Sequence, residues 1–259
     1  MVTAVIVQAR IGSSRLPGKV LQPLGARSAL VRCLERCARI TAAHEVICAV
    51  PDTPENDPVA REARSAGFRA TRGGEHDVLS RYADAARACG AETVVRITSD
   101  CPFVDPVIVD QTIALFHESG ADYASNSLPA QFPHGLDCEV FSAKRLFEAE
   151  RSASSAAERE HVTVWIQNNP AVRRAGLIGP GGGVERLRWT LDQPEDLQFC
   201  QRVFAHLGEA AADASAGVIA KLCLAEPALP AINARWHDAA RLDPSRRADV
   251  QLGPVELPE

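Results

Sequence analysis

Short apolar runs alternate with helical segments through the first 120 residues, and this alternation limits the possible folds more than any other feature of the sequence. Runs rich in β-branched residues predict strands, at 3–7, 45–50, 68–71 and 92–98. The segments that separate and follow them predict helices, at 29–40, from about 55 to 67, at 76–90 and at 106–120. Connections this short favour parallel strands joined by crossover helices. The expected fold is α/β, with a three-layer arrangement in which helices cover both faces of a mostly parallel sheet.

The pattern changes after residue 120. Two strands are expected, at 121–127 and 135–142, on either side of a segment that contains Pro129 and Pro133. A helical stretch follows at 157–169. An inserted arm at about 121–170, which can contain antiparallel strands, fits these elements better than another right-handed crossover.

The residues beyond the arm return to the earlier alternation. A strand is expected at 185–192 and a helix at 194–208, whose Pro194 suits the first helical turn. The residues after 225 are rich in proline and charge. We therefore expect a single domain over residues 1–225, followed by a peripheral tail over residues 226–259.

Composition narrows the class of protein further. The 259 residues are 46% hydrophobic and carry a net charge of −5, so the chain has no general attraction for nucleic acid and any polyanion site must be a local cluster of arginine and lysine. No apolar stretch approaches the roughly 20 residues that cross a bilayer, so we expect a cytoplasmic protein without a membrane segment. The eight cysteines are scattered singly, which favours buried thiols over a zinc site or disulfides.

The segment VQARIGSSRLPGKVL, residues 7–21, concentrates charge on a loop after the first predicted strand. Glycine lets backbone N–H groups approach a phosphate closely, and Arg10, Arg15 and Lys19 supply charge-assisted hydrogen bonds. A P-loop is excluded, because five residues separate Gly12 from Gly18 and Val20 follows the lysine where a magnesium-binding hydroxyl is required. The loop therefore predicts a phosphate site of another kind.

Two further loops place aspartates after predicted strands. Asp100 lies just beyond the end of the strand at 92–98 and has no evident structural role, so its carboxylate is a candidate ligand for Mg²⁺. Asp105 precedes Pro106 and fits a helix N-cap. Asp192 precedes the helix at 194–208, and spacing alone leaves it open whether this residue caps the helix or binds a metal.

Six ordered segments resemble a known family. They are QARIGSSRLPGKVL, RGGEHDVLSRY, RITSDCPFVDP, FPHGLDCEVF, EREHVTVWI and RWTLDQPEDL, and together they span residues 7 to about 200. The sequence is similar to the spore-coat-polysaccharide type cytidylyltransferases, relatives of the CMP-KDO synthetases and acylneuraminate cytidylyltransferases. The resemblance implies a nucleotide-diphospho-sugar transferase-like sheet with an inserted arm, and a homodimer. Ile11, Ser14 and Ser99 depart from common family residues, and of these only Ser99 lies beside a proposed metal ligand.

The same resemblance assigns roles to individual residues. It implies that the nucleotide is bound by Gln8, Arg10, Ser13, Arg15, Lys19, Arg72 and Asp77. It implies that Mg²⁺ is held by Asp100 and Asp192, and that Arg15, Lys19 and Asp100 are catalytic. It implies that the acceptor is bound by His134, Asp137, Glu139, Arg159 and His161. From the residues alone, His134 also fits an ordinary loop residue, Arg159 a solvated helix face, and His161 a half-buried structural histidine.

The implied activity is transfer of CMP from CTP to a small acidic acceptor, such as a sugar acid or a phosphonate, with release of pyrophosphate. The alternative is a nucleotide-sugar-dependent glycosyltransferase of the same fold, which commonly uses an Asp-x-Asp pair, and the closest match here is DCE at 137–139. A nucleotide-sensing protein without turnover is disfavoured, because the charged residues of all three loops are present. The expected partners are CTP, Mg²⁺ and a small-molecule acceptor.

Overall fold

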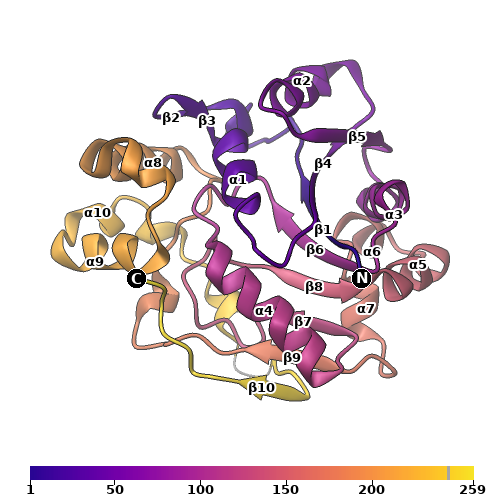
Figure 1. Ribbon diagram of the computed structural model, residues 1–259. Helices are drawn as coiled ribbons and strands as arrows, with labels where there is room; N and C mark the ends of the chain where they lie inside the picture. The colour runs from indigo at the N-terminus through magenta and orange to yellow at the C-terminus, as the bar shows by residue number, and fades with distance from the viewer. Residues whose placement is uncertain (244–245) are drawn as a thin grey trace.

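An eight-stranded sheet forms the centre of the computed structural model, which describes residues 1–243 and 246–259 (Figure 1). In spatial order the strands are β10 (Val250–Leu252), β9 (Arg174–Leu177), β7 (Tyr123–Ser125), β8 (Glu139–Ser142), β6 (Thr93–Thr98), β1 (Thr3–Gln8), β4 (Glu45–Pro51) and β5 (Arg69–Gly73). Strand β8 is antiparallel to both of its neighbours, and all other pairings in this sheet are parallel. The prediction of a mostly parallel sheet is confirmed.

Helices cover both faces of the sheet, which confirms the three-layer arrangement (Figure 1). One layer contains α1 (Ala29–Cys37), α2 (Asp57–Ser65), α4 (Pro106–Ser119), α8 (Pro194–Leu207), α9 (Ala216–Ala225) and the short α10 (Ala228–Ala231). The other contains α3 (Val78–Cys89), α5 (Ala143–Ser152), α6 (Ala156–Glu160) and α7 (Val164–Asn168). Alternate residues of β1 face opposite layers, because successive side chains of a strand point to opposite sides of the sheet. Val5 and Val7 pack with α1, whereas Ile6 packs with α3.

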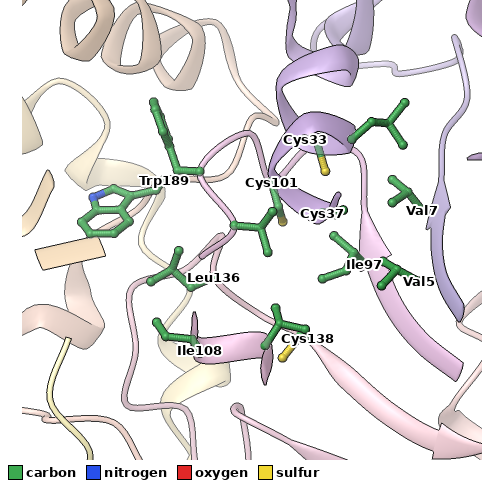
Figure 2. Close-up of a cluster of buried hydrophobic side chains, with 14 of the residues drawn as sticks. Val5, Val7, Cys33, Cys37, Ile97, Cys101, Ile108, Leu136, Cys138 and Trp189 are labelled. Carbon is green, nitrogen blue, oxygen red and sulfur yellow. The ribbon is translucent and has the colours of Figure 1, made fainter. Parts of the chain in front are cut away.

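The larger core cluster also anchors two of the loops that carry charged residues (Figure 2). Cys101, next to Asp100, and Trp189, three residues before Asp192, are both buried in this cluster, and the Trp189 side chain is fully buried. Removing a buried tryptophan side chain costs about 3–5 kcal/mol, so the core holds these loops firmly. The eight cysteines are free thiols, and seven of them are buried, as the sequence predicts, whereas Cys89 is half-buried.

Two expected elements differ from the structure. The predicted helix at 157–169 is divided into α6 and α7 by Val162, whose φ of 58° lies in the left-handed region. The strand predicted at 185–192 is wrong: a 3-10 turn (Val184–Arg186) is followed by an extended segment outside the sheet. The amide of Trp189 donates to the carbonyl of His134 at 2.7 Å, and the amide of Leu191 donates to that of Asp100 at 2.8 Å. Pairing with two loops, rather than with one strand, explains the difference.

The predicted arm and tail are also more closely integrated than expected. Strands β7 and β8 belong to the main sheet, so the predicted arm at 121–170 is partly integrated into it, and the loop 126–138 and the helices lie outside. In the segment predicted as a peripheral tail, Asn233 and Arg241 are buried and β10 pairs with β9. The prediction of a peripheral tail is corrected, because long-range pairing joins this segment to the sheet. Across residues 1–243 and 246–259, no helix has the length and apolar character needed to span a membrane.

Candidate active site

The loop after β1 leaves a row of backbone donors free. The amide of Gly18, at a φ of 66°, donates to the carbonyl of Ile11 at 3.2 Å, and the side-chain oxygen of Asn56 accepts from the amide of Ile11 at 2.8 Å. These bonds close the loop at its base. Within the described residues, no hydrogen bond uses the amides of residues 12–15. Successive free N–H groups beside arginine side chains are suited to bind phosphate oxygens.

Four charged residues from three separate loops meet at one point. The Lys19 ammonium lies 2.7 Å from Asp100 Oδ2 and 2.7 Å from Asp192 Oδ1, and Arg15 Nη2 lies 3.3 Å from the same oxygen of Asp192. Burial opposes the charged form of Lys19, but the two carboxylates raise its pKa above the ordinary value. Burial likewise opposes the ionisation of Asp100, but Lys19 holds the pKa of this carboxyl below its ordinary value. The Lys19–Asp100 pair is therefore charged at neutral pH.

A buried network positions Asp192. Asp196 is fully buried at the start of α8, and its Oδ2 accepts hydrogen bonds from the amides of Asp192 and Gln193, both at 2.9 Å. Arg188 donates to both oxygens of Asp196 at 2.8 Å, and Asn233 donates to Oδ1 at 2.9 Å. Burial opposes the charge on Asp196, but the bonds from Arg188 lower the pKa of this carboxyl. The network was not predicted from the sequence.

The two open questions about helix caps are answered by this geometry. Gln193, not Asp192, is the N-cap of α8, so the Asp192 carboxylate remains directed at Lys19. Asp105 is the N-cap of α4, as predicted, and its Oδ1 accepts from the amide of Val107 at 2.9 Å. Asp100 and Asp192 are therefore brought together, whereas Asp105 has a structural role.

A first cleft of about 250 Å³ contains most of the predicted nucleotide site. Its lining includes Gln8, Arg10, Ser13, Arg15, Lys19, Asp100 and Asp192, together with Ser14, Arg81, Ser99, Glu160 and His161, among others. The side-chain oxygen of Gln8 is buried and has no hydrogen-bond partner in the described part of the chain, so an acceptor is available to a ligand. Arg81 and Glu160 were missed as site residues, although both lie in segments that carry the family resemblance.

Three predicted site residues make other contacts. Arg72 pairs with Asp57 at 2.8 Å and donates to the carbonyl of Thr53 at 2.9 Å, and it lines neither this cleft nor the next. Asp77 caps α3 and pairs with Arg159. These bonds join α6 to α3, so Asp77 and Arg159 have structural roles in this structure, and neither lines a cleft. The sequence alone does not show that Arg159 pairs with Asp77, or that Arg72 pairs with Asp57.

A second cleft of about 320 Å³ adjoins the first, and Thr98 and His161 line both. It is lined by Arg96, Thr98, Ser127, His134, Asp137, Glu139, His161, Thr163, Val164, Gln167, Arg241 and Arg246. Four of the five predicted acceptor residues are in this set, and Arg159 is the exception. His134 Nδ1 lies 3.2 Å from Arg188 Nη1, and burial lowers the pKa of His134, so the ring is neutral at pH 7.

Glu139 lines this second cleft but its carboxylate is already occupied. It pairs with Arg96, and its Oε1 accepts from the Tyr123 hydroxyl at 2.6 Å and from the Thr163 hydroxyl at 2.6 Å. Gln167 donates to the same oxygen at 2.9 Å. Its predicted role as an acceptor ligand is therefore not supported by the geometry, because these bonds join β6, β7, β8 and α7 instead.

His161 lies at the junction of the two clefts on a strained turn. It is exposed, and Val162 beside it is fully buried with its φ of 58°. A β-branched residue rarely adopts this conformation, which costs roughly 1–2 kcal/mol. The turn is held by burial of Val162 and by the bond from Thr163 to Glu139. Because His161 is exposed, the alternative of a half-buried structural histidine is not supported.

Comparison with known proteins agrees with this geometry. A cytidylyltransferase family model matches residues 4–204. The spore coat polysaccharide biosynthesis protein SpsF of Bacillus subtilis is 33% identical over 212 residues, which cover 79% of this chain and 87% of that protein. The 3-deoxy-manno-octulosonate cytidylyltransferase of Geobacter sulfurreducens is 32% identical over 118 residues, 45% of this chain and 46% of that protein.

The fold is shared with a solved relative. The structure of a cytidylyltransferase from Leptospira borgpetersenii superimposes with a TM-score of 0.81 at 25% identity, over 88% of this chain and 96% of that one. The family match spans β1 to α8 and thus includes all three loops that meet at Lys19. The chain belongs to the cytidylyltransferase family and is a nucleotidyltransferase of the α/β sheet fold.

Proposed function

We propose that this enzyme transfers CMP from CTP to a small acidic acceptor and releases pyrophosphate, with Mg²⁺ held by Asp100 and Asp192. The observation that carries the proposal is the meeting of Lys19, Asp100 and Asp192 at the first cleft, beside a loop with free amides. The names of the relatives point in the same direction, since one acts on 3-deoxy-manno-octulosonate and another belongs to polysaccharide biosynthesis.

The donor set fits magnesium. Both carboxylates contact the same ammonium, so their oxygens converge on a common point. Mg²⁺ is usually bound by one or two carboxylates, with phosphate oxygens and water as the other ligands. Among residues 1–243 and 246–259, no group of three or more acidic, histidine or cysteine side chains is arranged to hold a metal, which agrees with a site that substrate phosphates complete. When bound, the ion would supply charge neutralisation at the α-phosphate.

The chain's own residues would act on the triphosphate. Arg10 and Arg15 are about half exposed at the mouth of the loop, where their guanidinium groups can bind phosphate oxygens as the loop closes over them. Lys19 would exchange its two carboxylates for a phosphate, because an ammonium and a divalent cation repel each other at the same oxygens. The acceptor oxygen attacks the α-phosphorus, the bond to the bridging oxygen of the pyrophosphate breaks, and the cations stabilise the leaving charge.

The second cleft is the proposed acceptor site. It adjoins the first cleft at Thr98 and His161, so an acceptor there would lie next to the nucleotide. His161 is exposed at this junction, where it can contact the acceptor hydroxyl or the α-phosphate. The glycosyltransferase alternative gains no support, since both acidic residues of the DCE segment are paired with arginine, Asp137 with Arg241 and Glu139 with Arg96.

Thermal unfolding with CTP, UTP, ATP and GTP, each with and without Mg²⁺, tests the nucleotide part of the proposal. A ligand at 100 times its dissociation constant stabilises by about 2.7 kcal/mol, and each kcal/mol raises the Tm by about 2–4 °C in a chain near this size. We expect CTP, and none of the other three nucleotides, to raise the Tm in a magnesium-dependent way. Pyrophosphate should then be released when sugar acids or phosphonates are added. A larger shift with UTP, ATP or GTP than with CTP would contradict the proposal.

A further inference from the structure

Two residues that line the second cleft lie beyond the segment that the family model matches. Arg241 and Arg246 both line the cleft, and the match ends at residue 204. Arg241 is buried in a 3-10 turn (Ala239–Leu242), donates to the carbonyl of Phe132 at 3.0 Å and pairs with Asp137. The C-terminal segment, described at residues 226–243 and 246–259, thus contributes side chains to the second cleft from beyond the residues that the family model matches.

Arg246 lies between two points at which this segment is attached to the fold. Arg241 attaches it on one side. On the other side β10 pairs with β9, and the amide of Asp249 donates to the carbonyl of Arg174 at 2.9 Å. The chain is therefore attached to the domain at Arg241 before Arg246 and from Asp249 onward after it, and the Arg246 side chain lines the cleft.

Among the described residues, the ion pairs of the second cleft leave the guanidinium of Arg246 without a counter-ion. Both carboxylates of the lining are paired, Asp137 with Arg241 and Glu139 with Arg96. The exposed Arg246 side chain takes part in no hydrogen bond or ion pair within the described ranges 1–243 and 246–259. Arg96 Nε is in addition a buried donor without a partner in the same part of the chain. A buried donor such as Arg96 Nε needs a partner from water or a ligand, and the exposed guanidinium of Arg246 in the same lining is free to bind an anion.

We infer that Arg246 binds an anionic group of the acceptor, and that the C-terminal segment makes the cleft selective for acceptors that carry a carboxylate or phosphoryl group. Guanidinium presents a planar fork of donors that matches both groups. The inference rests on the proposed function only in identifying the occupant as the acceptor, because the anion site itself is independent of CTP.

The experiment uses the full-length protein labelled with ¹³C at histidine, without nucleotide. Glycolate and inorganic phosphate are titrated separately at constant pH and ionic strength, and the ring resonance of His134, assigned with His134→Gln, is followed by NMR. His134 lines the second cleft and not the first, so its shift reports binding there. Arg246→Ala is the test variant, and its Tm without anion is expected to match wild type. Arg61→Ala is the control, since Arg61 is exposed on α2 and lines neither cleft.

We expect saturable shifts in wild type and Arg61→Ala, and dissociation constants about tenfold larger in Arg246→Ala, as for loss of a charge-assisted contact. The anion with the smaller dissociation constant identifies the carboxylate or the phosphoryl group as the preferred one. Equal affinities in wild type and Arg246→Ala, or no saturable shift of His134 with either anion, would overturn the inference. Failure of the proposed function would instead be seen as an absent CTP shift in thermal unfolding, so the two failures are distinguishable.

Discussion

Asp196→Asn tests whether the buried network behind Asp192 stabilises the site. The substitution keeps the size of the side chain but removes the charge that compensates Arg188, which is only 6% exposed. Breaking a buried ion pair by changing one partner costs about 3–5 kcal/mol. Arg188 retains a second carboxylate, Asp192, at 3.5 Å, so we expect a loss near 3 kcal/mol.

Urea unfolding measures this loss, and Glu195→Gln is the matched control. Glu195 is the neighbouring residue of α8. At the surface, where water screens the charge, its carboxylate pairs with Arg235 and accepts a hydrogen bond from the indole N–H of Trp236. We expect the control to be close to wild type. For Asp196→Asn, the loss corresponds to a Tm lower by roughly 6–12 °C. A free energy of unfolding within about 1 kcal/mol of wild type would refute the argument, since this is the range of surface pairs.

A second substitution separates the ion pair from the other bonds of Asp196. Combining Asp196→Asn with Arg188→Met removes the uncompensated cation, and replacement of both partners of a buried pair is often nearly neutral. Recovery should remain incomplete here, because the asparagine oxygen can still accept from the amides of Asp192 and Gln193, but its amino group then faces the Asn233 donor that Asp196 Oδ1 accepts from. Full recovery would show that the bond from Asn233 contributes little to the stability of the loop.

Three further predictions address the site and its surroundings. Asp100→Ala should abolish pyrophosphate release while far-UV circular dichroism stays unchanged, and a variant that retains a tenth of wild-type turnover would contradict the metal assignment. Burial opposes the ionisation of Asp137, but Arg241 lowers its pKa, so the folded state binds fewer protons than the unfolded state near the ordinary carboxyl pKa of 3.8. The Asp137–Arg241 pair therefore contributes fully to the free energy of unfolding above pH 3.8, and this contribution is lost as the pH falls through the lower pKa of Asp137 in the folded state. Urea unfolding from pH 7 to 3 should show a shallower acid loss in Asp137→Asn than in wild type, and identical slopes would exclude this contribution. At the left-handed Val162, glycine should be about 1 kcal/mol more stable than alanine, as measured by denaturant unfolding of both variants, and the reverse order would show that the turn is unstrained.

The sequence predicted the elements whose formation depends on local pattern. The alternation of apolar runs and amphipathic segments predicted β1, β4, β5 and β6 and the helices around them, because strand and helix periodicities are properties of short windows. The cap at Asp105 followed from Pro106 in the same way. The three loops that meet at Lys19 were expected from their place after strands and from the resemblance to a family.

Other features depended on which distant residues meet. The residues predicted to bind the acceptor illustrate this. Glu139 pairs with Arg96 on the neighbouring strand, and Arg159 pairs with Asp77, 82 residues away in the chain. The wrongly predicted strand at 185–192 has the composition of a strand, but its hydrogen bonds go to two loops. A pattern within a short window does not specify partners that only the folded chain brings together.

By itself, the sequence determined the α/β class, the alternation along the chain of parallel strands and the helices that connect them, and a charged phosphate loop after β1. Tertiary structure decided that Asp192 faces Lys19, that Arg72 and Arg159 lie outside the clefts, and that the C-terminal segment lines the second cleft. The physical reason is the range of the interactions. Backbone conformation and amphipathic burial are encoded in neighbouring residues, whereas the charges of a site are assigned by contacts between segments such as Asp137 and Arg241, 104 residues apart.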